Sequence, residues 1–336
     1  MTDNPEEDII VAADQGRFDL VTKLLENGAD PNTVNDIGTS ALHNAAKGGH
    51  WDISRLLLAK NASPRMENGN CATPLQLAIK AGHMQIVRLI FDSDPTICEF
   101  AEINPPKLLR IAAAFGHVEI VQILLDHNVS SLDNTKEITA LHYAAERGHH
   151  DVCDILLKHD KALNRSIWDR VTGPSLQVDR KDYAGQTPFY FAFNKRQTKT
   201  VEVFLRHYPD LTKAFDKHKH LLFHEAVRSR LFEMVQVFLD NGVDIQMKDY
   251  QGQNSLHVSV TAGCLFAPTY NEETAEMLRL LLSRGAAVDL KDKWGYTPEM
   301  YAQNPKIRML LRNHKASKGD SVKTMPRVSA PPPEYE

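Results

Sequence analysis

One apolar position recurs along most of the chain at intervals near 33 residues, and two small residues often follow it three and four places later. The recurring positions are Ile9, Leu42, Leu75, Leu109, Leu141, Phe189, Phe223, Leu256 and, more weakly, Glu299. Self-similarity at a fixed period indicates a repeat architecture. The two long intervals, after Leu141 and after Leu256, both return to about 33 residues when an insertion is removed.

Each repeat is predicted to hold two helices. The first is short and carries small residues such as Ala45 and Ala46, which let helices approach closely. The second places apolar residues at helical spacings of three and four, as in Ile120, Ile123 and Leu124. One such pair cannot cover its own apolar face, so neighbours must stack on it. The pattern predicts an all-α solenoid of about nine helix-turn-helix units, with a glycine allowing the tight turn inside many of them.

Two stretches carry a longer motif: T-P-L-Q-L-A at 73–78 and T-A-L-H-Y-A-A-E-R-G-H at 139–149. They resemble the ankyrin-repeat signature, and the resemblance extends over about residues 5–314. It implies a stack whose turns between repeats project as fingers. The units near 107–110, 221–224 and 297–300 depart from the signature. The last departure is expected, because the outer face of a terminal repeat meets water.

The predicted organisation is a solenoid over residues 1–314 followed by a disordered Pro-rich tail over 315–336. Insertions near 164–178 and 264–273 interrupt the repeats. The first enlarges a finger and contains Trp168, and the second falls in the turn between the helices of the eighth unit, at the opposite edge. Loops held by a rigid scaffold often bind partners. Neutral length variation is the alternative, because surface insertions are tolerated.

The composition narrows the function classes. A formal charge of −4, from 43 acids and 39 bases, is too balanced to indicate a nucleic-acid or membrane surface. The four cysteines form no C-x-x-C pair, so neither a zinc site nor a disulfide framework is suggested. The acidic N-terminus is unlike a signal peptide, and no apolar run reaches the roughly 20 residues that span a bilayer. We expect a protein of the cytoplasm, the nucleus or both, monomeric in isolation.

Eight of the 15 histidines occupy two recurring positions of the repeat. Those after the recurring apolar position are His43, His142, His224 and His257, and those closing the interhelical turn are His50, His83, His117 and His149. The ankyrin resemblance implies that these imidazoles tie adjacent loops together by hydrogen bonds.

Motifs of catalysis are missing from the sequence. His218 and His220 could chelate a metal, but no third ligand is nearby. The His224-Glu225 pair begins like a zinc-protease helix, yet Arg228 stands where the second histidine belongs. Phosphate-loop, dinucleotide and nucleophile-elbow motifs are also absent. We expect no enzyme activity, metal or cofactor, although dispersed residues could still converge in space.

The resemblance places four aromatic residues on finger tips in the C-terminal half: Tyr183, Tyr250, Trp294 and Tyr296. Exposed aromatic side chains are frequent anchors of protein interfaces. The alternative is that some of them pack against the neighbouring finger.

The ankyrin resemblance also implies a concave face lined by the first helices, and a second set of binding residues is expected there, just before the turn. Its members are Lys47, Lys80, Phe115, Glu146, Arg147, Lys195, Arg196, Arg228 and Arg230. Most are basic in a slightly acidic chain, which favours a client with an acidic segment, where charge sets on-rate and register. The alternative is an ordinary solvated helix face.

The tail ends in A-P-P-P-E-Y-E at 330–336, and consecutive prolines favour the extended helix that aromatic grooves bind. Pro332, Pro333 and Tyr335 resemble the P-P-x-Y ligand of WW domains, which often occur in HECT-type ubiquitin ligases. A solubilising tail is the alternative. The sequence as a whole predicts an adaptor that binds a client through the repeats and a WW-domain protein through the tail. A regulatory or inhibitory subunit that masks an enzyme or transcription factor with the repeats alone is the second hypothesis.

Overall fold

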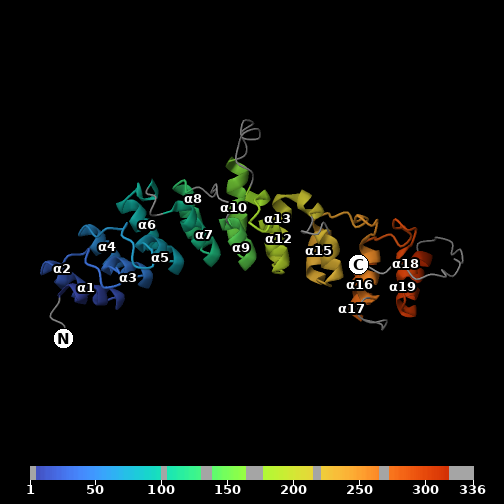
Figure 1. Ribbon diagram of the computed structural model, residues 1–336, viewed down its shortest axis with the longest axis horizontal. Coiled ribbons are helices and arrows are strands. Elements are labelled where there is room, and N and C mark those ends of the chain that lie inside the picture. Colours follow the sequence, from blue (N-terminus) through green and yellow to red (C-terminus); the bar gives the residue numbers. More distant parts are fainter. Residues whose placement is uncertain are drawn as a thin grey trace. The chain divides into compact units, whose positions relative to one another are not determined.

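The computed structural model describes residues 5–99, 104–129, 138–163, 177–214, 221–264 and 272–317 (Figure 1). The chain divides into two compact units, unit 1 over Met1–Lys195 and unit 2 over Arg196–Glu336. Each unit is described separately. Over the described ranges the structure is helical and holds no strand, apart from one isolated bridge between Val34 and Ser40. The all-α prediction is therefore confirmed.

Unit 1 is built from helices that follow one another in pairs. They are α1 (Pro5–Asp14), α2 (Phe18–Glu26), α3 (Ala41–Gly48), α4 (Trp51–Ala59), α5 (Pro74–Ala81), α6 (Met84–Ser93), α7 (Pro105–Phe115), α8 (Val118–Asp126), α9 (Ala140–Arg147), α10 (His150–Leu163) and α12 (Pro188–Asn194). Two short 3₁₀ turns, η1 (Ile97–Glu99) and η3 (Gln177–Asp179), lie between pairs.

Unit 2 follows the same plan. It contains α13 (Thr198–His207), η4 (Pro209–Lys213), α14 (Leu222–Arg228), α15 (Phe232–Asp240), α16 (Ser255–Cys264), α17 (Glu272–Ser283), α18 (Pro298–Tyr301) and α19 (Pro305–Ser317). None of the helices in the described ranges has both the length and the apolar character needed to cross a membrane.

The first helices have well-defined ends. The side chains of Thr73, Thr139 and Thr187 each accept a hydrogen bond from the backbone N–H three residues later, which caps α5, α9 and α12. Proline occupies the first turn of α5 and α12, where its missing N–H costs nothing. Glycines in the left-handed conformation, such as Gly82 and Gly116, end α5 and α7 and turn the chain into the second helix.

Burial of the recurring apolar positions holds each unit together. Within unit 1, α1, α3, α5, α7, α9 and α12 contact one another in series, and α2, α4, α6, α8 and α10 form a second layer (Figure 1). In unit 2, α14 contacts α16, and α16 contacts α18. The recurring positions from Ile9 to Leu256 are almost fully buried. Glu299 is only half-buried and pairs with Arg312 at 2.5 Å, so the weakest recurring position carries an ion pair in place of an apolar contact.

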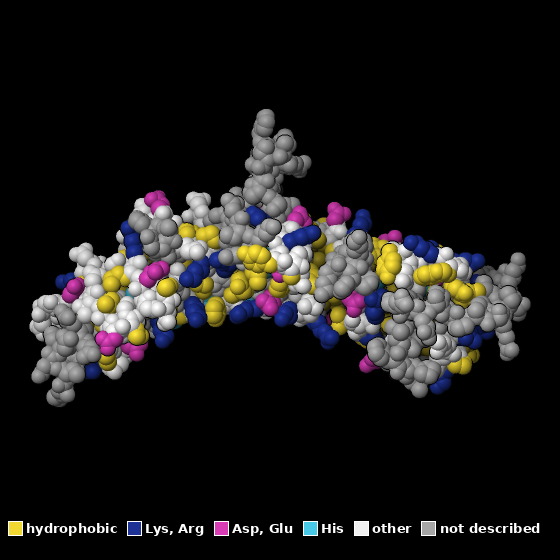
Figure 2. Space-filling view, in the orientation of Figure 1, with side chains coloured by type: hydrophobic (Ala, Val, Ile, Leu, Met, Phe, Trp, Pro, Cys, Tyr) yellow, Lys and Arg dark blue, Asp and Glu magenta, His cyan; other side chains and the backbone are white. Residues whose placement is uncertain are grey.

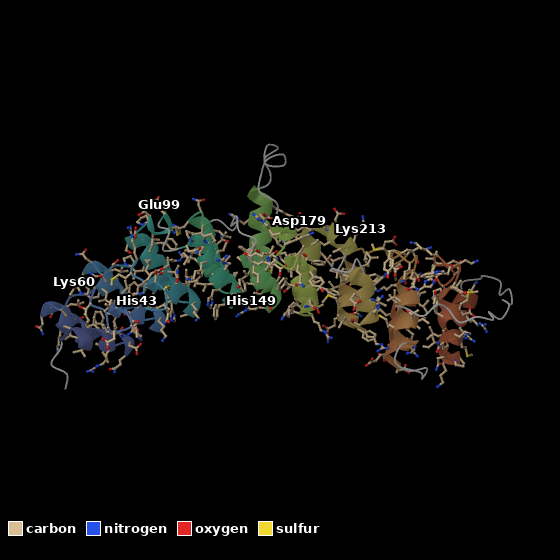
Figure 3. The ribbon with its side chains drawn as sticks, in the orientation of Figure 1. His43, Lys60, Glu99, His149, Asp179 and Lys213 are labelled. Atoms are coloured by element: carbon tan, nitrogen blue, oxygen red, sulfur yellow. The ribbon has the colours of Figure 1, made fainter. Side chains whose placement is uncertain are left out.

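The two edges of unit 1 differ. His149, in an interhelical turn, lies at one edge, and Asp179, which precedes the next finger, lies at the other (Figure 3). Part of both predicted insertions, together with Trp168, lies outside the described residues. The same holds for Pro332, Pro333 and Tyr335 in the tail.

Candidate functional site

The fingers are shaped by a side chain at the base of each turn. The Asp182 Oδ1 atom accepts hydrogen bonds from the backbone N–H groups of Ala184 and Gln186, at 2.9 and 2.7 Å. Asn35, Asn68, Asp249 and Asp292 accept the equivalent pair of bonds in their own fingers. Short polar side chains of this kind stabilise tight turns. The sequence analysis missed these residues, although their position three places before a finger glycine or its equivalent was visible.

Neighbouring fingers also bond to one another within each unit. In unit 1 the Gly69 N–H donates to the Ile37 carbonyl at 2.7 Å, and in unit 2 the Lys293 N–H donates to the Gln251 carbonyl at 3.0 Å. The finger tips are thus held in a fixed register. A fixed backbone presents the tip side chains at low entropic cost to a partner.

Three of the four predicted finger-tip aromatics are exposed. The exposed fractions are 77% for Tyr183, 56% for Tyr250 and 48% for Trp294. Tyr296 differs, because its ring is half-buried and packs edge-on against Tyr301 with centroids 5.7 Å apart. Tyr296 therefore packs on α18 of its own repeat, and neither of the two expectations, an exposed anchor or packing on the neighbouring finger, describes it.

The turn histidines connect each repeat of unit 1 to the one before it. The Nε2 atoms of His50, His83, His117 and His149 lie 3.1–3.3 Å from the backbone carbonyls of Asp14, Lys47, Lys80 and Ala114. Because a carbonyl oxygen can only accept, Nε2 carries the proton and donates. The predicted loop-tying role is confirmed for these four residues.

The buried histidines connect each repeat to the finger that follows. His43 donates to the Ala72 carbonyl at 3.1 Å and His142 to the Gln186 carbonyl at 3.1 Å, both in unit 1. His257 donates to the Tyr296 carbonyl at 3.0 Å in unit 2. Burial is the main cause that lowers the pKa of all three imidazoles, which favours their neutral form.

His224 is the exception. It is 2% exposed, and neither ring nitrogen has a hydrogen-bond partner in the described parts of unit 2. Burial and then the positive charge of Arg228 lower the pKa of the imidazole to about 4, and the Met247 backbone, which does not reach hydrogen-bond geometry, raises it by less. The predicted loop-tying role is therefore wrong for His224 as far as the structure describes its surroundings, since its repeat carries the imidazole without the bond.

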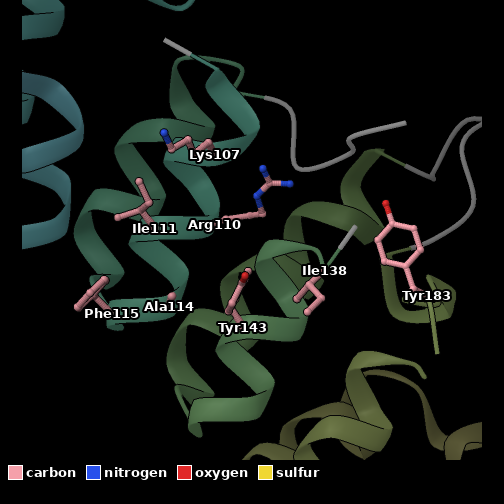
Figure 4. A pocket seen from close by; sticks show the side chains of 8 residues that line it. All are labelled: Lys107, Arg110, Ile111, Ala114, Phe115, Ile138, Tyr143 and Tyr183. Atoms are coloured by element: carbon pink, nitrogen blue, oxygen red, sulfur yellow. The ribbon is translucent and has the colours of Figure 1, made fainter. Parts of the chain in front are cut away.

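An open groove lies between α7 and α9, on the face of unit 1 that the first helices form. This face is called the inner face. The described residues that line it are Lys107, Arg110, Ile111, Ala114, Phe115, Ile138, Tyr143 and Tyr183, and its volume is about 510 Å³ (Figure 4). In Figure 4, Lys107, Ile111 and Phe115 follow one side of α7, and Tyr143 faces them from α9. Only Phe115 and Tyr183 were predicted as binding residues, because the remaining ones look like ordinary helix and loop positions.

Cationic side chains lie in and beside this groove and also on the first helices that precede it. The Arg147 guanidinium lies over the Phe115 ring, 5.6 Å from its centroid, which is a cation–π contact. Lys195 pairs with Glu146 at 3.2 Å, so the acidic member of the predicted set is neutralised. Lys47 and Lys80 are exposed at the ends of α3 and α5.

Two of the three basic residues predicted in unit 2, Arg196 and Arg230, are placed differently from the prediction, whereas Arg228 lies at the end of its first helix as expected. Arg228 pairs with Glu225 on its own helix at 3.0 Å, and Arg230 pairs with Glu273 at 3.6 Å. Arg196 and Arg230 have φ angles of 57° and 55°, in the turn position that glycine takes in unit 1. They therefore sit inside the turns, one step beyond the helix-face positions expected for them. The predicted basic set is divided between the two units, with Arg196, Arg228 and Arg230 in unit 2 and the other members in unit 1.

Comparison with known proteins agrees with this arrangement of paired helices, fingers and histidine bonds. A family model for ankyrin repeats (3 copies) matches residues 9–104 and 96–167, and one for ankyrin repeats (many copies) matches 141–205. The mouse B-cell lymphoma 3 protein homolog is 25% identical over 66% of this chain and 46% of its own length. In Saccharomyces cerevisiae, Target of rapamycin complex 2 subunit AVO2 is 23% identical over 60% of this chain and 43% of its length.

A third relative, the probable 26S proteasome regulatory subunit p28 of the same yeast, is 27% identical over 48% of this chain and 62% of its own length. The chain thus spans about half the length of these curated relatives. The glycine turns and histidine bonds between the repeats of unit 1 lie within the matched region, and helix pairs and the His257 bond continue the same features in unit 2. The chain belongs to the ankyrin-repeat family.

Proposed function

We propose that this chain is a protein-interaction subunit that binds a client through the inner helix face and the fingers of unit 1. The observation that supports this most directly is the open apolar groove between α7 and α9, bordered by cationic side chains. Apolar surface left in contact with water next to rigid fingers is typical of a binding site. Two of the relatives bear names of complex subunits, one of Target of rapamycin complex 2 and one a probable regulatory subunit of the 26S proteasome.

The client is proposed to present an acidic segment. Lys47, Lys80 and Arg147 are exposed on three of the first helices of unit 1, α3, α5 and α9, and Lys195 neutralises Glu146 on α9. A row of cations of this kind accelerates encounter with an acidic partner and disfavours a basic one. The proposed setting is the cytoplasm or the nucleus.

Charge reversal tests the client surface. A variant with Lys47→Glu, Lys80→Glu and Arg147→Glu should capture much less client in affinity purification followed by quantitative mass spectrometry. The matched control reverses Lys23, Lys60 and Arg88, which are exposed on the second helices or at their ends, and should capture the parental amount. Equal capture by both variants would contradict an acidic client on the inner face.

The tail is proposed to recruit a WW-domain protein through Pro332, Pro333 and Tyr335. A peptide of residues 324–336 should retain a WW-domain ligase from lysate, and the Tyr335→Ala peptide should not. The competing proposal is a regulatory subunit that acts through the repeats alone. Deleting 315–336 distinguishes the two, because the adaptor loses function and the regulator keeps it.

A further inference from the structure

We propose that the groove between α7 and α9 is the anchor site for an acidic peptide segment that inserts one large apolar side chain. The proposal rests on the protein-binding function above and names the chemistry of its partner. The residues that carry it form an apolar floor, Ile111, Phe115 and Tyr143, with Lys107 and Arg110 beside it.

The shape of the groove suits a peptide better than an enclosed small molecule. It is open along one side, and its volume of about 510 Å³ exceeds that of a single side chain. Small-molecule sites bury most of the ligand surface, which an open groove does not. An extended segment can instead lie along the opening and direct one side chain onto the floor (Figure 4).

The floor offers apolar surface that water now contacts. Phe115 is 42% exposed, and Ile111 and Tyr143 are half-buried. Covering such side chains removes apolar area from water, which favours association. Tyr143 also combines its apolar ring with a polar hydroxyl group, a combination that is common in interface anchors.

The positive charges of the groove favour acidic residues on either side of the peptide's apolar residue. The described lining contains two cations, Lys107 and Arg110, and no carboxylate. Among the described residues, the Lys107 ammonium reaches only the Cys71 carbonyl, at 3.5 Å, and Arg147 covers the Phe115 ring at the other end of the floor. Figure 2 shows hydrophobic side chains gathered over this part of unit 1 with lysines and arginines at their margin. A segment with carboxylates on both sides of its apolar residue matches this pattern.

A nucleic acid fits the groove less well. Phosphate binding draws on many cations and on aromatic faces stacked with bases. The described lining of this groove contains only two cations, Lys107 and Arg110, and it includes three aliphatic residues that do not stack with bases, namely Ile111, Ala114 and Ile138. The apolar and cationic parts together favour a peptide.

Selection from a library identifies the peptide without assuming its sequence. Short random peptides displayed on phage are selected on the full-length protein, and the enriched sequences are synthesised with a fluorescent label. We expect acidic sequences with one Leu, Ile, Phe, Tyr or Trp. Fluorescence anisotropy then gives their affinity for the parent and for the variants.

Two substitutions with equal exposure test the floor. Phe115→Ala should weaken the selected peptide about tenfold, the loss typical of an aromatic interface anchor. Phe18→Ala removes a ring of nearly the same exposed fraction, 40% against 42%, from the first turn of α2, and should leave the affinity unchanged. Tyr143→Ala gives a second measurement on the floor, and circular dichroism confirms that each variant is folded.

A double charge reversal tests the two cations that line the groove. Lys107→Glu with Arg110→Glu should weaken the peptide by more than about tenfold at low salt and flatten the salt dependence of its affinity. Lys23→Glu with Lys60→Glu makes the same charge change on the second-helix layer and should have little effect.

Several outcomes would overturn the proposal. Selected peptides that are basic, or that bind Phe115→Ala as tightly as the parent, would exclude this groove while leaving the protein-binding function intact. Binding that appears only after residues 318–336 are deleted would assign the groove to the chain's own tail. If the variant with Lys47→Glu, Lys80→Glu and Arg147→Glu no longer captures the client but still binds the selected peptides, the client does not bind through this groove.

Discussion

At the residue scale, two histidines in equivalent repeat positions have opposite environments. His142 donates to the Gln186 carbonyl, and its Nδ1 atom accepts from the Thr139 N–H at 3.2 Å. His224 is equally buried but has no partner among the described residues of unit 2. A buried polar group is stabilising only when its hydrogen bonds are made, so the two imidazoles should respond differently to replacement.

Replacing each ring by leucine measures this difference. His142→Leu should lower the free energy of unfolding by about 1–3 kcal/mol. It leaves the Thr139 N–H unpaired and removes one of the two hydrogen bonds that the Gln186 carbonyl accepts, the other coming from the Asp182 N–H. His224→Leu should leave the stability unchanged or raise it, since it removes an unpaired polar ring. Urea unfolding at pH 7.5 provides the measurement. A loss for His224→Leu as large as that for His142→Leu would show that His224 has a partner.

The buried histidines also make stability depend on pH. Their pKa values in the folded protein lie below the ordinary value of 6.5, at about 4 for His224, with burial as the largest cause in each case. Below pH 6.5 the unfolded chain therefore binds protons that the folded chain does not, and stability is lost as the pH falls from 6.5 towards 4.

We expect the urea midpoint to fall between pH 7 and pH 5, with about 1.4 kcal/mol lost per pH unit for each histidine kept neutral. In His224→Leu the dependence should be shallower, and the difference between the two slopes isolates this one group. Identical slopes would mean that His224 titrates normally in the folded protein.

At the scale of elements, the interhelical turn combines a backbone conformation with a steric fit. Gly82 has a φ of +81°, and a Cβ atom on it would meet the His117 ring at 2.7 Å. That ring donates to the Lys80 carbonyl in the same turn. Glycine is therefore required at this position for two reasons. Its backbone adopts the left-handed conformation without strain, and its missing side chain leaves room for the histidine ring of the next repeat.

Gly242 allows the two effects to be separated. It has the same φ of +81°, but a Cβ atom on it would meet none of the described residues within 4 Å. Gly242→Ala should cost about 1 kcal/mol from backbone strain alone. Gly82→Ala should cost clearly more, and adding His117→Ala should recover the steric part of the loss. Thermal unfolding of the four proteins forms the test, and equal costs at the two glycines would contradict the fit.

Helices were more predictable from the sequence than fingers. The helix pairs follow from Leu42, Leu75 and their equivalents, because apolar spacing and burial are directly linked. The prediction placed Arg196 and Arg230 on a helix face, but both lie in the turn. Residues other than glycine rarely adopt a positive φ, and the sequence carries no signal when they do.

The groove was only partly predictable for another reason. Phe115 and Tyr183 were expected to bind, but Ile111 and Tyr143 carry no motif. Their role depends on which faces of α7 and α9 come together, which a sequence pattern does not specify. Likewise, whether His224 finds a carbonyl depends on the path of the following finger, and the repeat motif alone does not fix that path.

At the scale of the whole molecule, the chain behaves as two units with contacts mainly between sequence neighbours. In stacked repeats each element is stabilised by the elements beside it. Damage in one repeat should therefore spread to its neighbours and weaken with distance along the chain.

Leu75→Ala tests this locality. The side chain is fully buried in α5, so its truncation should cost about 2–5 kcal/mol. Hydrogen exchange followed by mass spectrometry should show faster exchange in α3, α5 and α7, and little change in α14 to α17. Uniformly faster exchange in both units would mean that the chain unfolds as one cooperative body.

The histidine bonds have a consequence for how such a chain can change length. Every turn in the middle of unit 1 supplies both a carbonyl for the repeat after it and an imidazole for the repeat before it. Excising residues 50–82 would join Gly49 to His83 and bring that ring to the Asp14 carbonyl now used by His50. Whole repeats can thus be lost or duplicated while every turn histidine still finds a carbonyl acceptor. A partial deletion would instead leave either an imidazole donor or a carbonyl acceptor without its partner.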